Sequence, residues 1–220
     1  MNIFDILGPI MIGPSSSHTA GVVRIGNIAR RILGATPNRA TVQFHGSLAK
    51  TYKGHGSDKA IIAGLLGFPP DDVRIRDSLT LSTDLDYQIQ VVELENAHPN
   101  TVLLELFSEK LQKTLLMQAA SVGGGNILVQ KINEIDVLFD GYHDTLVIIH
   151  KDKPGAVSLV SNVLAVEKIN IAEMKMYRSK KGGQAIMIIE LDEQVDKSLA
   201  KTLSALPLMT KVTLLSGMAS

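Results

Sequence analysis

The segment GPSSSHTAG places three hydroxyl side chains directly before an imidazole. The start of a helix needs one Ser, Thr, Asp or Asn side chain to accept a hydrogen bond from a free backbone N–H group. One of Ser15, Ser16 and Ser17 is enough for capping, which leaves the other hydroxyls, His18 and Thr19 for a different task. Because free N–H groups and the positive end of the helix dipole meet at such a start, we expect this segment to bind an anion such as a carboxylate.

A second imidazole, that of His55, lies between Gly54 and Gly56. Neighbours without side chains leave an imidazole accessible, and its ordinary pKa near neutrality suits a group that takes up and releases protons. His55 is therefore a candidate general base. A turn in which His55 caps the following helix is a competing interpretation of the same residues.

Two further segments contain weaker candidates. Ser47 lies in a stretch of small residues that permits a close approach of the backbone to a ligand, although ordinary loops share that composition. Gly124 is the middle of three glycines that precede a strand-like run at 127–129. A dinucleotide-binding fingerprint would continue into a helix, so we expect a turn or a bulge here and no nucleotide.

The elements that position these residues follow from hydrophobic spacing. Apolar residues between 22 and 33 recur at helical intervals and Gly34 ends the pattern, which predicts an amphipathic helix directly after the seryl stretch. The remaining elements predicted for a first, mixed domain are a helix at 57–66 and strands at 40–45, 87–94, 101–107, 114–120 and 127–132.

Polarity and glycine content rise around 138–145, which predicts two domains, 1–142 and 143–220. The second domain reads strand, helix, strand, strand, helix, strand, the ferredoxin-like βαββαβ order, so the expected fold class is α+β. Its predicted elements are strands at 145–150, 169–179, 184–191 and 211–216, with helices after Pro154 and at 196–205.

Side-chain positions in the second domain are predicted from the same patterns. Val157, Val160, Val163 and Leu164 share one helical face and are expected in the core. Alternation along a strand places Met174 and Met176 in that core as well. The histidines expected at the surface or in loops are His98, His143 and His150.

Composition excludes several classes of function. The 220 residues carry 22 basic and 22 acidic side chains without a basic block, so we expect no nucleic-acid partner. No apolar stretch approaches the ~20 residues that span a bilayer, and the start of the chain lacks signal-peptide features, so we expect a cytoplasmic protein without membrane contact. The chain has no cysteine, which excludes disulfides, a thiol nucleophile and thiolate metal ligands.

Three motifs in order, GPSSSHTAG, HGSLAKTYKGHGSDKA and SVGGGNI, resemble the beta chain of iron-sulfur-dependent L-serine dehydratases. The second domain resembles an ACT domain, a small regulatory module, and KDKPGA matches its first strand-to-helix loop. The likeness covers essentially the whole chain. It implies conversion of L-serine to pyruvate and ammonia by two chains, with a 4Fe-4S cluster held by the cysteines of an alpha chain.

The resemblance also implies roles for particular residues. His55 would be the general base and His18 a second catalytic residue, and this chain would provide no metal ligand. Asp152, Pro154 and Gly155 would contact an effector of the ACT domain. The implied substrate-binding residues are Ser15, Ser16, Ser17, Thr19, Ser47 and Gly124.

A rival interpretation makes the chain a regulatory subunit that senses amino acids without catalysing a reaction. The first domain also resembles the allosteric substrate-binding domain of some phosphoglycerate dehydrogenases, and under this interpretation the histidines are dispensable. Because edge strands and helical faces of ACT domains commonly pair between copies, we expect the isolated chain to form a homodimer.

Overall fold

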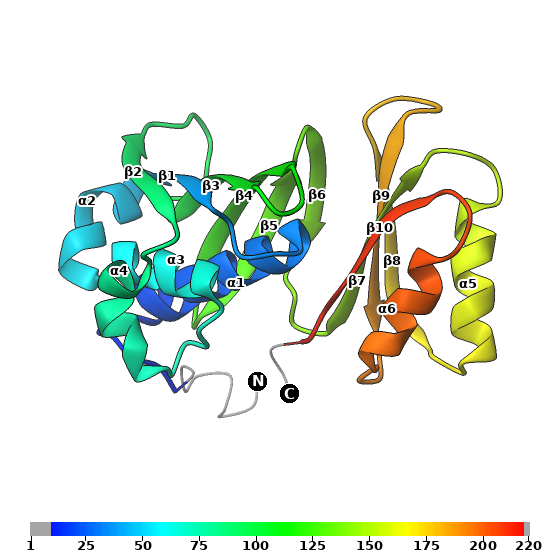
Figure 1. Ribbon diagram of the computed structural model, residues 1–220, viewed down its shortest axis with the longest axis horizontal. Helices are drawn as coiled ribbons and strands as arrows, with labels where there is room; N and C mark the ends of the chain where they lie inside the picture. Colours follow the sequence, from blue (N-terminus) through cyan, green and yellow to red (C-terminus); the bar gives the residue numbers. More distant parts are fainter. Residues whose placement is uncertain (1–9, 218–220) are drawn as a thin grey trace. The chain divides into compact units, whose positions relative to one another are not determined.

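The computed structural model describes residues 10–217, and the chain divides into two compact units, Met1–Asn133 and Glu134–Ser220 (Figure 1). Each unit has its own helices. None of the helices within residues 10–217 is long and apolar enough to cross a membrane.

The first unit contains both helices and strands. Its elements in chain order are η2 (Ser16–Ala20), α1 (Gly21–Leu33), β1 (Arg39–His45), α2 (Gly46–His55), α3 (Ser57–Leu66), η3 (Val73–Asp77), α4 (Ser78–Leu81), β2 (Asp86–Val92), β3 (Thr101–Ser108), β4 (Lys113–Gly123) and β5 (Asn126–Ile132).

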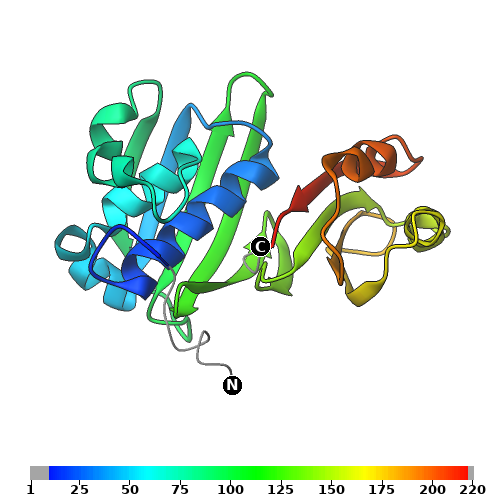
Figure 2. The same cartoon turned by 90° about the horizontal axis from the view of Figure 1, so that it is seen from below.

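The strands of this unit lie in the order β2-β1-β3-β4-β5. β1 runs parallel to β2, and β1 and β3, β3 and β4, and β4 and β5 pair antiparallel. Helices cover one face of the sheet (Figure 2). Alternation along β1 sends Val42 and Phe44 into this covered face, where both are fully buried, and leaves Gln43 on the other face.

α1 and α3 approach each other closely because glycines meet at their crossing. A Cβ atom on Gly26 would lie 2.7 Å from the carbonyl oxygen of Ile61, and one on Gly64 would overlap the carbonyl oxygen of Val23. The two backbones are therefore in direct contact. Since α1 continues from the seryl stretch and α3 begins two residues after His55, this contact fixes the spacing of the two candidate segments.

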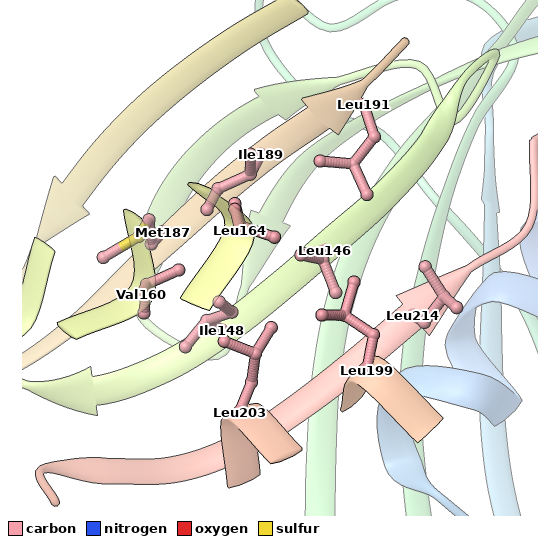
Figure 3. Close-up of a cluster of buried hydrophobic side chains, with 10 residues drawn as sticks. All are labelled: Leu146, Ile148, Val160, Leu164, Met187, Ile189, Leu191, Leu199, Leu203 and Leu214. Carbon is pink, nitrogen blue, oxygen red and sulfur yellow. The ribbon is translucent and has the colours of Figure 1, made fainter. Parts of the chain in front are cut away.

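The second unit confirms the βαββαβ order. Its elements in chain order are β6 (Ile135–Phe139), β7 (Asp144–Lys151), α5 (Ala156–Val166), β8 (Ile171–Arg178), β9 (Gln184–Leu191), α6 (Lys197–Ser204) and β10 (Met209–Leu215). Its four-stranded sheet has the order β10-β7-β9-β8, and every neighbouring pair is antiparallel. Figure 3 shows the core that the helices and the sheet enclose, formed by Leu146, Ile148, Val160, Leu164, Met187, Ile189, Leu191, Leu199, Leu203 and Leu214.

Most predicted elements are confirmed, but the sequence patterns did not predict η3, α4 and β6, nor α2 between the strand at 40–45 and the helix at 57–66. The helix begins with Gly46 at a φ of 60° and contains Gly54, both poor helix formers. Within this fully described helix, Leu48 is the one buried side chain, so hydrophobic periodicity carries no signal for it.

Two core predictions in the second unit are wrong. Val157 is 40% exposed because the buried stripe of α5 runs through Ala156, Val160 and Leu164, and Val157 lies about 100° around the helix from Ala156. Met176 is 43% exposed because β8 is an edge strand with one open side, whereas Met174 packs against the core.

The prediction that His150 lies at the surface is also wrong, since this side chain is 1% exposed. β7 is a central strand between β9 and β10, so a residue on its helix-covered face is buried. Its Nδ1 lies 2.9 Å from the carbonyl oxygen of Lys151 and its Nε2 lies 3.3 Å from the sulfur of Met176. His143 is exposed in a loop, as predicted.

The contact between α1 and α3 predicts a large difference between two Gly→Ala substitutions. Gly64→Ala should lower the free energy of unfolding by about 1–3 kcal/mol, because the new methyl group forces the helices apart. Gly54→Ala is the matched control: a Cβ at Gly54 meets no atom within 4 Å, so it should leave stability unchanged or raise it by about 0.5–1 kcal/mol. Urea unfolding of both variants measures this, and equal stabilities would contradict the close contact.

Candidate functional site

The seryl stretch forms the first turn of a continuous helix. Ser15 has an extended backbone, and its side-chain oxygen accepts a hydrogen bond of 3.2 Å from the backbone N–H of His18. η2 follows as a wide turn in which Gly21 N donates to the carbonyl oxygen of Ser16, and α1 continues without a break. The prediction that one serine caps the helix is confirmed with Ser15. The helical structure begins at Ser16 rather than after the stretch.

Hydroxyl groups lie beside both ring nitrogens of His18. Its Nδ1 is 3.0 Å from Ser17 Oγ and 3.3 Å from Ser15 Oγ, and its Nε2 is 3.2 Å from Ser47 Oγ. A hydroxyl can donate or accept a hydrogen bond, so these neighbours hold the ring in place in either tautomer. The structure therefore brings Ser47 to the seryl stretch, from which it is separated by 29 positions.

Ser47 reaches this place because the start of α2 is pressed against the loop before β3. The backbone N–H of Ser47 donates a hydrogen bond of 2.7 Å to the carbonyl oxygen of Pro99. A Cβ on Gly46 would lie 2.6 Å from that same carbonyl oxygen, so only glycine fits there. The positive φ of Gly46 aims the first turn of α2 at His18.

His55 ends α2 and faces His18. The centroids of the two imidazole rings are 4.8 Å apart, and the ring planes are tilted by 37°. The His55 Nδ1 atom is buried and has no hydrogen-bond partner among residues 10–217. The N-cap of α3 is Gly56, and no side chain caps that helix. The interpretation of His55 as a cap is therefore wrong, and its ring remains free for chemistry.

Two crossing hydrogen bonds connect the seryl turn to the junction of α2 and α3. Thr19 Oγ1 donates to the carbonyl oxygen of His55 over 3.2 Å, and Ser57 Oγ donates to the carbonyl oxygen of His18 over 2.8 Å. Both donors are buried side chains. Each histidine backbone is thus held by a hydroxyl from the opposite segment.

Burial lowers the pKa of His18, and the neighbouring His55 lowers it further. Both causes disfavour the charged imidazolium. His18 is consequently neutral at pH 7, with one ring nitrogen able to donate and one able to accept a hydrogen bond.

The structure places the other predicted site residues elsewhere. Gly124 lies exposed in the turn between β4 and β5, where it and both neighbouring glycines have positive φ. In the second unit, the Asp152 carboxylate accepts a hydrogen bond from Gly182 N and pairs with Arg178, and these contacts, the Gly182 bond first, lower its pKa. Pro154 and Gly155 lie exposed in the turn before α5.

Three functional candidates escaped the sequence analysis. Ser57 follows the GHG motif, and Ser121 opens SVGGGNI, so adjacency to a motif was the available signal. Asn100 carries no local signal. Asn100 Oδ1 and Ser121 Oγ are buried and, within the described part of the chain, lack hydrogen-bond partners.

The residues of this chain do not fit an iron-sulfur cluster. The sequence contains no cysteine, and residues 10–217 contain no group of three or more His, Asp or Glu side chains arranged to hold a metal ion. What the arrangement offers is a helix start with hydroxyl donors, suited to a carboxylate, beside two imidazoles suited to proton transfer.

Comparison with known proteins gives consistent matches. The family described as serine dehydratase beta chain matches residues 2–91, and the ACT domain family matches residues 145–208. The chain is 42% identical over 214 residues to the probable L-serine dehydratase, beta chain, of Bacillus subtilis (strain 168), covering 96% of each protein. It is 37% identical over 199 residues to the L-serine dehydratase, beta chain, of Peptoniphilus asaccharolyticus, covering 89% of each. L-serine dehydratase 2 of Escherichia coli (strain K12) is 47% identical over 81 residues, which are 34% of this chain and 17% of that protein.

The lowered pKa of His18 predicts a loss of stability in mild acid. The unfolded chain, with a histidine pKa of about 6.5, binds the proton more tightly than the folded chain does. The free energy of unfolding should therefore fall as the pH drops through about 6.5 and level off below the folded pKa. Urea unfolding between about pH 7.5 and pH 5 measures this dependence.

His18→Gln removes the titrating group and should flatten that pH dependence, whereas His143→Gln, at an exposed position, should leave it unchanged. An unaltered slope in His18→Gln would show that His18 titrates normally in the folded protein.

Proposed function

Because this chain belongs to the family of L-serine dehydratase beta chains, we propose that it forms an active L-serine ammonia-lyase only together with a cysteine-bearing alpha chain. The name "beta chain" of its relatives supports a two-chain enzyme. The Escherichia coli relative is compatible with such a division, since the segment similar to this chain is 17% of its length and most of that protein lies outside the match.

The reaction removes the proton on the α-carbon of L-serine and expels its hydroxyl group. Hydroxide is a poor leaving group at neutral pH and needs a Lewis acid to help it leave. The sequence has no cysteine and residues 10–217 present no metal-ligand set, so we expect the partner chain to supply this Lewis acid. A 4Fe-4S cluster on the alpha chain would supply that Lewis acid. Loss of water leaves 2-aminoacrylate, which tautomerises to an imine and hydrolyses to pyruvate and ammonia.

The substrate carboxylate binds, in this proposal, at the seryl turn. The hydroxyls of Ser16 and Ser17 and the free N–H groups of the first helical turn are donors for a carboxylate. Thr19 supports this turn from behind, because its hydroxyl already donates to the carbonyl oxygen of His55. Ser15 positions His18 by capping the helix, and Ser47 orients the ring of His18 from the opposite side. His18 itself donates one ring N–H.

His55 takes the α-proton. The observation that carries this role is the meeting of His18 and His55, from segments 37 positions apart in sequence, with their rings 4.8 Å apart at one helix start. Two charged imidazoles at that distance would repel each other, and the lowered pKa of His18 avoids this. When His55 takes up a proton, the neighbouring His18 is therefore neutral and does not repel it.

The ACT domain would regulate the enzyme by binding an effector at the turn of Asp152, Pro154 and Gly155. Gly155, with a φ of 93°, lies at the N-terminus of α5, and the turn is accessible. If the whole chain were a sensor instead, an effector would still bind there, but the chain would not need His55.

Anaerobic mixing of this chain with its alpha chain should yield serine-dependent formation of pyruvate. His55→Ala should lower kcat by about 100-fold or more, since removing a general base costs that much, while size-exclusion chromatography shows the same assembly. His143→Ala, exposed and in the second unit, is the control and should retain the parental rate. A His55→Ala complex with the parental rate would favour the sensor.

A further inference from the structure

Two buried oxygen atoms next to the candidate site are not explained by the roles above. Within residues 10–217, Asn100 Oδ1 and Ser121 Oγ have no hydrogen-bond partner, although both are shielded from solvent. Buried polar atoms in folded proteins are nearly always hydrogen-bonded, because an unpaired one loses its bonds to water without compensation. These two oxygen atoms, on residues that are hydrogen-bonded to each other, are therefore candidate contacts for a bound ligand.

Asn100 and Ser121 hold each other in place. The backbone N–H of Ser121 donates to the carbonyl oxygen of Asn100 over 3.0 Å, and Asn100 Nδ2 donates to the carbonyl oxygen of Ser121 over 3.3 Å. The second bond settles the orientation of the amide, since its nitrogen end is the one that faces a carbonyl. The Oδ1 atom therefore keeps both acceptor positions free.

This pair lies between the two segments that carry the candidate site. Asn100 follows Pro99, whose carbonyl oxygen accepts the hydrogen bond from Ser47 N at the start of α2. Ser121 Oγ packs against Gly21 so closely that a Cβ on Gly21 would overlap it. Ser47 contacts His18, and Gly21 directly follows η2. The pair thus adjoins the seryl turn from the side of β3 and β4.

The chemistry of the pair complements that of the seryl turn. The hydroxyls, imidazole and helix N–H groups described above are donors for a carboxylate. An α-amino acid also carries an ammonium group, whose three N–H bonds need acceptors. An amide oxygen accepts only, and a serine hydroxyl can accept, so Asn100 and Ser121 add acceptors beside the donors of the seryl turn.

We propose that Asn100 Oδ1 and Ser121 Oγ accept hydrogen bonds from the α-ammonium group of L-serine. This inference rests on the proposed function and deepens it, because it assigns the part of the site that distinguishes an α-amino acid from a hydroxy acid. The carboxylate is held at the helix start, and the ammonium group is held by the Asn100–Ser121 pair.

The test compares two ligands of the assembled two-chain enzyme under anaerobic conditions. L-serine has the ammonium group, and 3-hydroxypropanoate is the same molecule without it. Asn100→Ala and Ser121→Ala should each raise the KM for L-serine by about 10- to 100-fold, the range for a hydrogen bond to a charged group. The inhibition constant of 3-hydroxypropanoate should stay within about twofold of the parental value.

Ser108→Ala is the matched control, because Ser108 is a buried serine at the other end of β3 whose hydroxyl accepts from Leu111 N. It should leave both constants unchanged. If a variant at Asn100 or Ser121 weakens both ligands equally, or neither, the pair has a structural role and the proposal is wrong. Either variant alone decides this when the other fails to fold.

Failure of the proposed function is distinguishable from failure of this inference. If the parental complex forms no pyruvate, calorimetry with both ligands still measures recognition of the ammonium group. The inference then requires that the parental complex prefers L-serine over 3-hydroxypropanoate and that both alanine variants lose this preference. A parental complex without the preference would overturn it.

Discussion

The candidate site depends on the two hydrogen bonds that cross between the seryl turn and the junction of α2 and α3. Each histidine backbone carbonyl accepts from a hydroxyl of the opposite segment: His55 from Thr19 and His18 from Ser57. Because both donors are buried, water does not compete for these bonds. The rings of His18 and His55 consequently face each other at a distance set by the backbone rather than by flexible side chains.

Glycines make this arrangement possible because they let backbones approach. Gly26 and Gly64 bring α1 against α3, and Gly46 brings α2 against the carbonyl of Pro99. These backbone contacts limit how far the segments around the site can move. The side chain of His18 therefore stays partly buried next to His55. His18 is partly buried beside another imidazole, and its pKa falls as a result. The packing that buries His18 and the neighbouring His55 thus both favour the neutral form of this candidate site residue.

Local patterns predicted the elements that bury apolar residues at regular intervals. The helix at Gly21–Leu33 and the strands β1, β3 and β9 are of this kind. Local patterns failed where burial depends on neighbours in space: α2 has one buried side chain, and His150 is buried because β7 lies between two other strands. The seryl turn and His55 were found from their motifs, while Asn100 had no signal because its partner Ser121 lies far along the chain.

Because this chain has no thiol group, the proposed enzyme divides the work between two chains. If the partner chain supplies the Lewis acid, the groups that hold and deprotonate the substrate must be in place before the two chains meet, since the substrate has to be oriented toward a metal that this chain does not control. The crossing hydrogen bonds and the glycine contacts hold the candidate site residues in position within this one chain. The unpaired acceptors Asn100 Oδ1 and Ser121 Oγ belong to the same arrangement, because the hydrogen bonds between these two residues hold them in place while no group within residues 10–217 pairs with either oxygen.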